Sequence, residues 1–294
     1  MTPGGSVPTD SAVPELDGAP LFLLDEVPDG DVLTVAGPEG RHAVDVLRLA
    51  PGERVRVGNG RGLVAEGTVL AAGPDGLRVL GLPVRSLSPE SAENASRPAV
   101  LINVVLTAGP EGLRVAVRER FEVPPQTPEF VLVQALPKGD HGPLAVDLAT
   151  ELGVDRIVPW PASRCVTRWR EDRVDRGLAK WRSAARAASK QSRRPRVPEV
   201  TEPMSTREVC GLLADADLAL VLHEQARRPL TELTIPQSGT VVVVVGPEGG
   251  RTDGEVVAFR AAGASAVRLG PEVLRTSTAG AAAFAALATR TRWA

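Results

Sequence analysis

The sequence has little of the side-chain chemistry that hydrolytic enzymes and metal sites usually need. It holds two cysteines, Cys165 and Cys210, without CxxC spacing, and three histidines, none of them in an HExxH arrangement. The residues therefore indicate neither a disulfide framework nor a zinc site, and we expect no metal. Two free thiols are typical of a protein of the reducing cytoplasm, which is the location we expect.

Long apolar runs and a leader are also missing. No stretch approaches the roughly 18 consecutive apolar residues of a membrane span, so we expect no membrane association. The first 18 residues lack the basic and apolar regions of a signal peptide, and we expect a disordered tail at 1–18. A hydrophobic content of 43% over 294 residues is typical of a soluble protein of about two domains.

The net charge of −2 would not by itself suggest a nucleic-acid partner. The segment 164–196, however, contains twelve Arg and Lys against three Asp and Glu, so it carries +9 and the rest of the chain carries −11. A basic stripe on an acidic body is typical of local phosphate binding, although a solvated helix face would look the same.

The first part of the chain has the pattern of a small β-barrel. Short apolar strands separated by Gly, Pro and Asp are expected at 21–24, 32–35, 54–57, 63–70 and 77–80, with one helix near 42–49. AAGPDGLRV recurs as TAGPEGLRV 36 residues later, which indicates an insertion or duplication at about 80–115. We predict a first domain at 19–125 that contains this insertion.

From about residue 128 to the end, buried strands alternate with helices, which predicts an α/β domain with a parallel sheet. Its strands are EFVLVQAL, DRIVP, DLALVLHE, TVVVVVG and SAVRLG. Its helices include a long basic one near 171–192, one that opens with a Thr252-x-x-Glu255 capping box, and an Ala-rich final one suited to packing or dimer formation.

The tetrapeptide GPEG occurs three times, at 37–40, 109–112 and 246–249. The first two copies have polar surroundings and are predicted to be a turn before the first helix and a hairpin turn. The third follows five valines, and the carboxyl end of such a strand is where open α/β sheets bind ligands. A similar Gly-Pro loop at 270–276 and the end of LVLHE at 220–224 are expected to complete one pocket.

Such a pocket, made of backbone groups and apolar walls, suits an adenine and a ribose. Methyl transfer from a sulfonium needs positioning and a deprotonated acceptor, but neither a metal nor a nucleophilic side chain. The shortage of His, Cys and paired carboxylates fits this chemistry better than hydrolysis.

The ordered motifs ALPKGD, ATELGVDRIVP, KQSRRPRVPEV, GPEGG and LGPEVLRTSTAG resemble the RsmE family. These are 16S ribosomal RNA uridine-N3 methyltransferases of the SPOUT superfamily. The segment from GPEGR to GNGRG resembles the family's N-terminal PUA-like RNA-binding barrel. The resemblance implies a SPOUT methyltransferase domain at 128–294 with a trefoil knot, bound S-adenosyl-L-methionine (SAM), a homodimer, and a uridine of small-subunit RNA as target.

The resemblance also implies the cofactor residues, which lie in three loops. Two departures from the family are Ser277, where an acid is usual, and Lys190-Gln191, where an EQ-like pair is usual. The carried-over cofactor residues are Leu222, His223, Glu224, Gly246, Pro247, Glu248, Gly249, Gly250, Leu269, Gly270, Leu274, Arg275 and Thr276.

Two residues are candidates for the chemistry itself. Arg275 could favour the N3 anion of the uridine, or could be a helix-start arginine that pairs with a carboxylate. Glu248 could be the base or could cap a loop, and His223 is expected to be an ordinary loop histidine. The RNA phosphate candidates are Lys138, Lys190, Arg193 and Arg194, with Arg41, Arg48 and Arg61 on the barrel as weaker ones.

Three functions remain open from the sequence. The first is methylation of a uridine N3 in 16S ribosomal RNA, with the base flipped out of its stack. The second keeps the fold and moves the target to a ribose 2′-hydroxyl or to a transfer RNA. The third is a catalytically silent RNA-binding protein, which the serine at Ser277 would permit.

Overall fold

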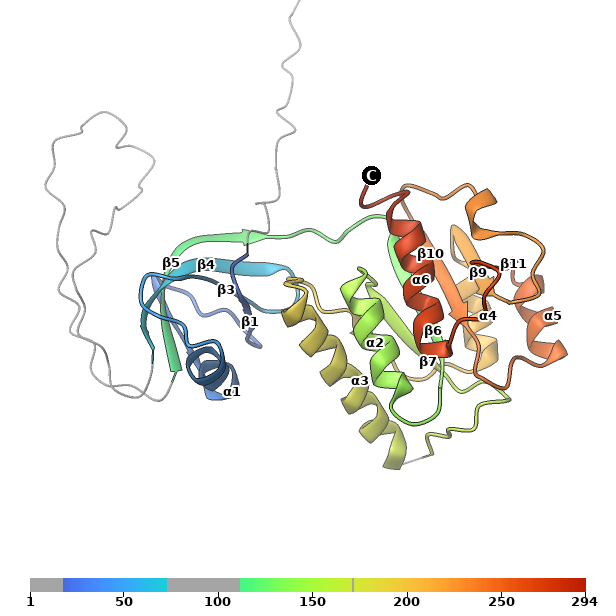
Figure 1. Cartoon of the computed structure of the whole chain (residues 1–294), viewed down its shortest axis with the longest axis horizontal. Coiled ribbons are helices and arrows are strands. Elements are labelled where there is room, and N and C mark those ends of the chain that lie inside the picture. The colour runs from blue at the N-terminus through green and yellow to red at the C-terminus, as the bar shows by residue number, and fades with distance from the viewer. Residues whose placement is uncertain (1–17, 73–111, 171) are drawn as a thin grey trace, which may run out of the picture. The chain divides into compact units, whose positions relative to one another are not determined.

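The computed structural model describes residues 18–72, 112–170 and 172–294, and the chain divides into two compact units (Figure 1). The described part of the first unit comprises 18–59, 63–72 and 112–122, and that of the second comprises 60–62, 123–170 and 172–294. Nearly all of the predicted tail, most of the predicted insertion and the strand expected at 77–80 lie outside the described residues. The domain limits drawn from the sequence stay a prediction.

The first unit is a curled, mainly antiparallel sheet of five strands in the order β1-β3-β4-β5-β2. Only β1 and β3 run parallel. In β2, exposed and buried residues alternate, because successive side chains of a strand point to opposite faces. The strands are β1 (Leu21–Leu23), β2 (Val32–Ala36), β3 (Arg54–Gly58), β4 (Leu63–Ala72) and β5 (Gly112–Glu122).

The first GPEG copy is helical, and the turn predicted there is wrong. Gly37–Arg41 forms α1, and the π-helix His42–Val46 continues it. A proline in the first helical turn removes an N–H group that would have no partner there, and its fixed φ suits the helix. Gly40 packs on the preceding strand, where a Cβ atom would collide with the Val35 carbonyl oxygen. Of the second copy only Gly112 is described, as the first residue of β5.

The second unit is built on a six-stranded sheet in the order β11-β9-β10-β6-β7-β8, and every neighbouring pair is parallel. Its central strands are buried on both faces, as the unbroken apolar runs predicted. The predicted α/β class is thereby confirmed. The strands are β6 (Glu129–Ala135), β7 (Arg156–Trp160), β8 (Glu199–Val200), β9 (Leu218–Leu222), β10 (Thr240–Val245) and β11 (Ser265–Val267).

Helices cover both faces of this sheet, with α2, α3 and α6 on one side and α4 and α5 on the other (Figure 1). The sequence did not predict α4, although its capping box between Ser205 and Glu208 would have indicated it. The helices are α2 (His141–Glu151), α3 (Asp172–Gln191), α4 (Thr206–Ala214), the 3₁₀ turn Leu230–Glu232, α5 (Asp253–Ala261) and α6 (Thr276–Ala288). None of the described helices is long and apolar enough to cross a membrane.

Candidate functional site

A cavity of about 620 Å³ lies at the carboxyl ends of β9, β10 and β11, which are neighbours in the sheet. The three loops that follow these strands line it, together with the first turns of α6. Every predicted cofactor residue except Arg275 is among its lining residues. The sequence missed several others, including Arg164, Gln225, Arg251 and Arg268.

The loop after β10 needs its glycines for two different reasons. Gly250 has φ +70°, which side-chain-bearing residues rarely adopt, and its amide donates to the Pro247 carbonyl at 2.9 Å. Gly249 lies against the segment after β7, because a Cβ atom there would come within 3.0 Å of the Arg164 carbonyl oxygen. The third GPEG is therefore a tight backbone wall of the cavity.

The loop after β11 leads into α6 through Arg275, the N-cap residue, whose backbone is extended at φ −64° and ψ 150°. Its carbonyl accepts hydrogen bonds from the amides of Thr278 and Ala279, both at 2.9 Å. The Arg275 side chain is exposed, and Thr276 and Ser277 are buried beside it. The structure thus places Arg275 next to the cavity wall rather than in it.

His223 follows β9 and is held by backbone groups. Its amide donates to the Val267 carbonyl at 2.9 Å, and its Nδ1 atom accepts from the Gln225 amide at 3.1 Å. The neighbouring Glu224 carboxylate lies 3.6 Å from Nδ1 and is largely exposed. These contacts to backbone groups favour the predicted role of an ordinary loop histidine.

Glu248 points its carboxylate at a backbone amide. Its Oε1 atom accepts from the Lys138 amide at 3.2 Å, so it ties the loop after β10 to the loop after β6. Of the two roles predicted for Glu248, this contact favours loop capping.

Arg251, which the sequence analysis missed, lies just before α5 and folds back over the start of the loop. Its guanidinium carbon would be 3.7 Å from a Cβ atom on Gly246. Burial lowers the pKa of this guanidinium, while the nearby carboxylates of Glu224 and Glu255 act to raise it. Its Nε and Nη1 atoms are buried and have no hydrogen-bond partner within the described part of the chain.

Glu255 anchors the same corner from the first turn of α5. Its carboxylate accepts from the amides of Ser163 and Thr252, both at 2.8 Å, and the predicted capping box with Thr252 is confirmed. Burial raises the pKa of Glu255, but these hydrogen bonds outweigh it and hold the pKa below its ordinary value of 4.5.

Most of the predicted RNA contacts are surface residues. Arg41, Arg48, Lys138 and Arg193 are exposed, and Lys190 is half-buried in the last turn of α3. Arg61 lies in a bridge to Arg196 within the second unit. Among the described residues, no cluster of three or more His, Cys, Asp or Glu could hold a metal ion.

Arg194 is the exception, because its guanidinium points into the protein. Its Nη1 atom donates to the carbonyls of Thr150 at 2.6 Å and Val154 at 2.8 Å, and its Nη2 atom lies 3.5 Å from Asp155. Burial lowers its pKa to about 10, against the opposing effect of Asp155. This geometry argues against the predicted phosphate contact and gives Arg194 a structural role.

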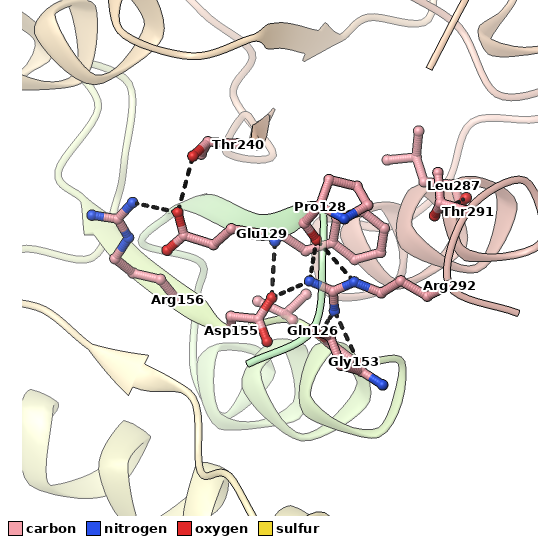
Figure 2. Close-up of polar contacts among 12 residues, drawn as sticks. Gln126, Pro128, Glu129, Gly153, Asp155, Arg156, Thr240, Leu287, Thr291 and Arg292 are labelled. Atoms are coloured by element: carbon pink, nitrogen blue, oxygen red, sulfur yellow. Dashed lines mark hydrogen bonds and ion pairs between the residues drawn. The ribbon is translucent and has the colours of Figure 1, made fainter. Parts of the chain in front are cut away.

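Arg292 occupies the centre of the same cluster, at the amino ends of the strands (Figure 2). Its side chain is 2% exposed and forms an ion pair with Asp155. It also donates to the carbonyls of Pro128 at 2.9 Å and Gly153 at 2.5 Å. Its guanidinium carbon lies 3.9 Å from the ring centre of Phe130. The last residues of the chain are thereby fixed to the sheet.

Comparisons with known proteins agree with this geometry. The RNA methyltransferase domain family matches residues 125–288, and the RNA methyltransferase PUA domain family matches residues 35–80. The ribosomal RNA small subunit methyltransferase E of Mycobacterium bovis is 41% identical over 281 residues, which are 94% of either chain. The enzyme of that name from Bacillus subtilis is 29% identical over 167 residues, 54% of this chain and 65% of its own.

The crystal structure of a ribosomal RNA small subunit methyltransferase E from Neisseria gonorrhoeae, bound to SAM, is similar as well. Its TM-score is 0.69 at 26% identity, and the match covers 93% of this chain and 98% of that one. Fold, cavity and domain matches define the class as RNA methyltransferases with a PUA domain. The chain belongs to the ribosomal RNA small subunit methyltransferase E family, as its motifs predicted.

Proposed function

We propose that this chain methylates N3 of a uridine in the 16S RNA of the small ribosomal subunit, with SAM as methyl donor. The observation that carries the proposal is the cavity at the ends of β9, β10 and β11, which twelve of the thirteen predicted cofactor residues line. The 41% identity to a small-subunit RNA methyltransferase over 94% of the chain supports the substrate.

The reaction needs a deprotonated uridine nitrogen. N3 would lose its proton to solvent, its lone pair would attack the methyl carbon, and the bond from that carbon to sulfur would break, with the electron pair left on the sulfur of S-adenosylhomocysteine. SAM supplies the methyl group and its own leaving group, so the protein contributes binding, orientation and stabilisation of the anion. Arg275 is suited to the last task, because its exposed side chain begins α6 beside the Thr276 that lines the cavity.

RNA is expected to meet the exposed basic side chains, foremost Lys138 and Arg193 of the second unit. The basic helix α3 carries further Arg and Lys, and such contacts release counterions, so affinity should fall steeply with salt. Within this proposal the target base leaves its stack to reach the methyl group. We further propose a cytoplasmic homodimer whose second unit holds the trefoil knot typical of the superfamily.

Calorimetry with SAM tests the cofactor site. The wild type should bind, and Gly249→Val should weaken binding by about tenfold or more, because added bulk forces the loop away from Arg164. The matched control is Gly254→Val on α5, where the nearest atom is Thr252 Oγ1 at 4.0 Å and which is not one of the residues that line this cavity. A wild type without measurable SAM binding would overturn the proposal.

The target is tested on small subunits from a strain that lacks the modification. Nucleoside mass spectrometry after incubation with protein and SAM should show N3-methyluridine in 16S RNA. A 2′-O-methylated nucleoside or methylation of transfer RNA would move the target, and RNA binding without methylation would favour a silent protein. With Arg275→Ala we expect lower turnover at unchanged SAM affinity, and unchanged turnover would remove Arg275 from the mechanism.

A further inference from the structure

Arg251 is the one lining residue of the cavity, within the described chain, whose guanidinium atoms are both buried and left without a hydrogen-bond partner. The other two arginines of the lining, Arg164 and Arg268, are exposed, and the Nη1 atom of Arg164 donates to the Gly249 carbonyl at 3.4 Å. A buried guanidinium N–H group without an acceptor is costly, so native proteins usually supply one. For Arg251 that acceptor is missing on the protein side.

The surroundings of Arg251 indicate what kind of ligand group could accept hydrogen bonds from its guanidinium. The carboxylates of Glu224, another lining residue, and of Glu255 both act to raise the Arg251 pKa, yet no ion pair joins either to Arg251 among the described residues. Glu255 is held by the Ser163 and Thr252 amides, so the cavity has a cationic and an anionic side chain, Arg251 and Glu224, that form no ion pair with each other within the described chain. This arrangement matches a zwitterion, whose carboxylate and ammonium groups need partners of opposite charge.

The size of the cavity and the burial of the Arg251 guanidinium favour a small molecule over RNA as its partner. The Nε and Nη1 atoms are buried even from a water-sized probe, so a ligand meets them only once the Arg251 side chain turns toward the cavity. A terminal carboxylate on a ligand inside the 620 Å³ cavity can meet the turned guanidinium, whereas a phosphodiester flanked by two sugars fits there less easily.

We propose that Arg251 is a positioning residue that binds the carboxylate at the amino-acid end of the cofactor. The inference rests on the proposed function, because it assumes a cofactor that joins an amino acid to a nucleoside. Arg251 would not take part in the methyl transfer itself. By fixing the amino-acid end over Gly246, it would set the direction in which the sulfonium methyl points.

The test compares two ligands that differ in the amino-acid end. S-adenosylhomocysteine keeps the carboxylate, and 5′-methylthioadenosine lacks the whole amino-acid end. By calorimetry, Arg251→Met should weaken S-adenosylhomocysteine binding roughly 10- to 100-fold, the range for a hydrogen bond to a charged group. It should leave the affinity for 5′-methylthioadenosine unchanged, and Arg251→Lys should give an intermediate result.

The matched control is Arg260→Met, which removes the same charge from the exposed end of the adjoining α5. It should change neither affinity. Tryptophan fluorescence reports the second unit alone, because all four tryptophans (Trp160, Trp169, Trp181 and Trp293) belong to it, and it verifies that each variant is folded.

The outcomes separate the two proposals. If the wild type binds neither ligand, the proposed function fails and this inference fails with it. If the wild type binds both, and Arg251→Met and Arg251→Lys weaken both ligands equally or neither, only the inference is overturned. A raised KM for ribosomal subunits with unchanged binding of both ligands would assign Arg251 to an RNA phosphate instead.

Discussion

The two ends of the parallel sheet use arginine in opposite ways. At the carboxyl ends of the strands, Arg251 has buried nitrogens without a partner. At the amino ends, each of the three guanidinium nitrogens of Arg292 donates a hydrogen bond within the protein. The first arrangement leaves binding capacity for a ligand at the expense of stability, and the second stabilises the fold and leaves nothing to bind. The comparison teaches that an arginine is interpreted from its unmet hydrogen bonds rather than from its charge.

The largest expected effect is at the amino end. Arg292→Met removes the ion pair with Asp155, which among the described residues keeps only the Phe130 amide at 2.9 Å and Arg194 at 3.5 Å, and leaves the Pro128 and Gly153 carbonyls without the Arg292 donor. We expect a loss of roughly 3–5 kcal/mol in the unfolding free energy of the second unit. Urea unfolding followed by tryptophan fluorescence measures it. Arg156→Met is the control, because its pair with Glu129 is more exposed and should contribute about 0–1 kcal/mol. Equal losses would contradict the assigned role of Arg292.

Arg194→Met should come next, with a loss of roughly 1.5–3 kcal/mol, because two backbone carbonyls and Asp155 lose a charged donor. Its neighbour Arg193 is exposed, so Arg193→Met should leave the unfolding midpoint unchanged. In an RNA-binding assay the order of the two effects should be reversed. Arg193→Met should lower the magnitude of the slope of log K against log salt by about one, and Arg194→Met should leave it unchanged. A reduced slope for a folded Arg194→Met would restore the phosphate contact that the structure argues against.

Glu255 tests whether the carboxyl end also contains a stabilising group. Its folded pKa lies below the ordinary 4.5, so its stabilisation is complete above that value and is lost as the pH falls through the folded pKa. We expect Glu255→Gln to lower the free energy of unfolding at pH 7 by about 1 kcal/mol. This difference from the wild type should become smaller as the pH falls below 4.5, because the wild-type carboxylate is then protonated as well. Unfolding midpoints at several pH values measure both. A gap that stays constant down to acid pH would exclude this linkage.

The smallest effect has the opposite sign. Without cofactor, Arg251→Met should leave the second unit as stable as the wild type or more stable by up to about 1 kcal/mol, because it removes buried donors that have no acceptor. With saturating SAM the order should reverse, because only the wild type gains the full stabilisation of the bound ligand. A variant that is clearly less stable without ligand would show that Arg251 has an internal partner.

The cavity loops were predictable because each follows a run of apolar residues, and the carboxyl ends of parallel strands meet at one edge. Arg251 was missed since one arginine before a capping box has no periodic signal. Arg292 was missed because its partners are 137 to 166 residues away in the sequence. The structure argues against the phosphate contact predicted for Arg194, because a count of charges does not give the direction of a side chain. The turn predicted at the first GPEG was wrong because glycine and proline also begin helices.

The pairing of β6 with β10 has a consequence for how the protein is made. Thr240 lies opposite Glu129, 111 residues earlier in the chain, and both strands belong to the middle of the sheet. At a synthesis rate of roughly 5–20 residues per second, β6 leaves the ribosome about 5–20 s before its neighbour exists. During that interval an apolar strand has one unpaired edge, which is the condition under which nascent chains associate wrongly. The yield of folded protein should therefore depend on translation speed and on chaperones that cover β6 until β10 arrives.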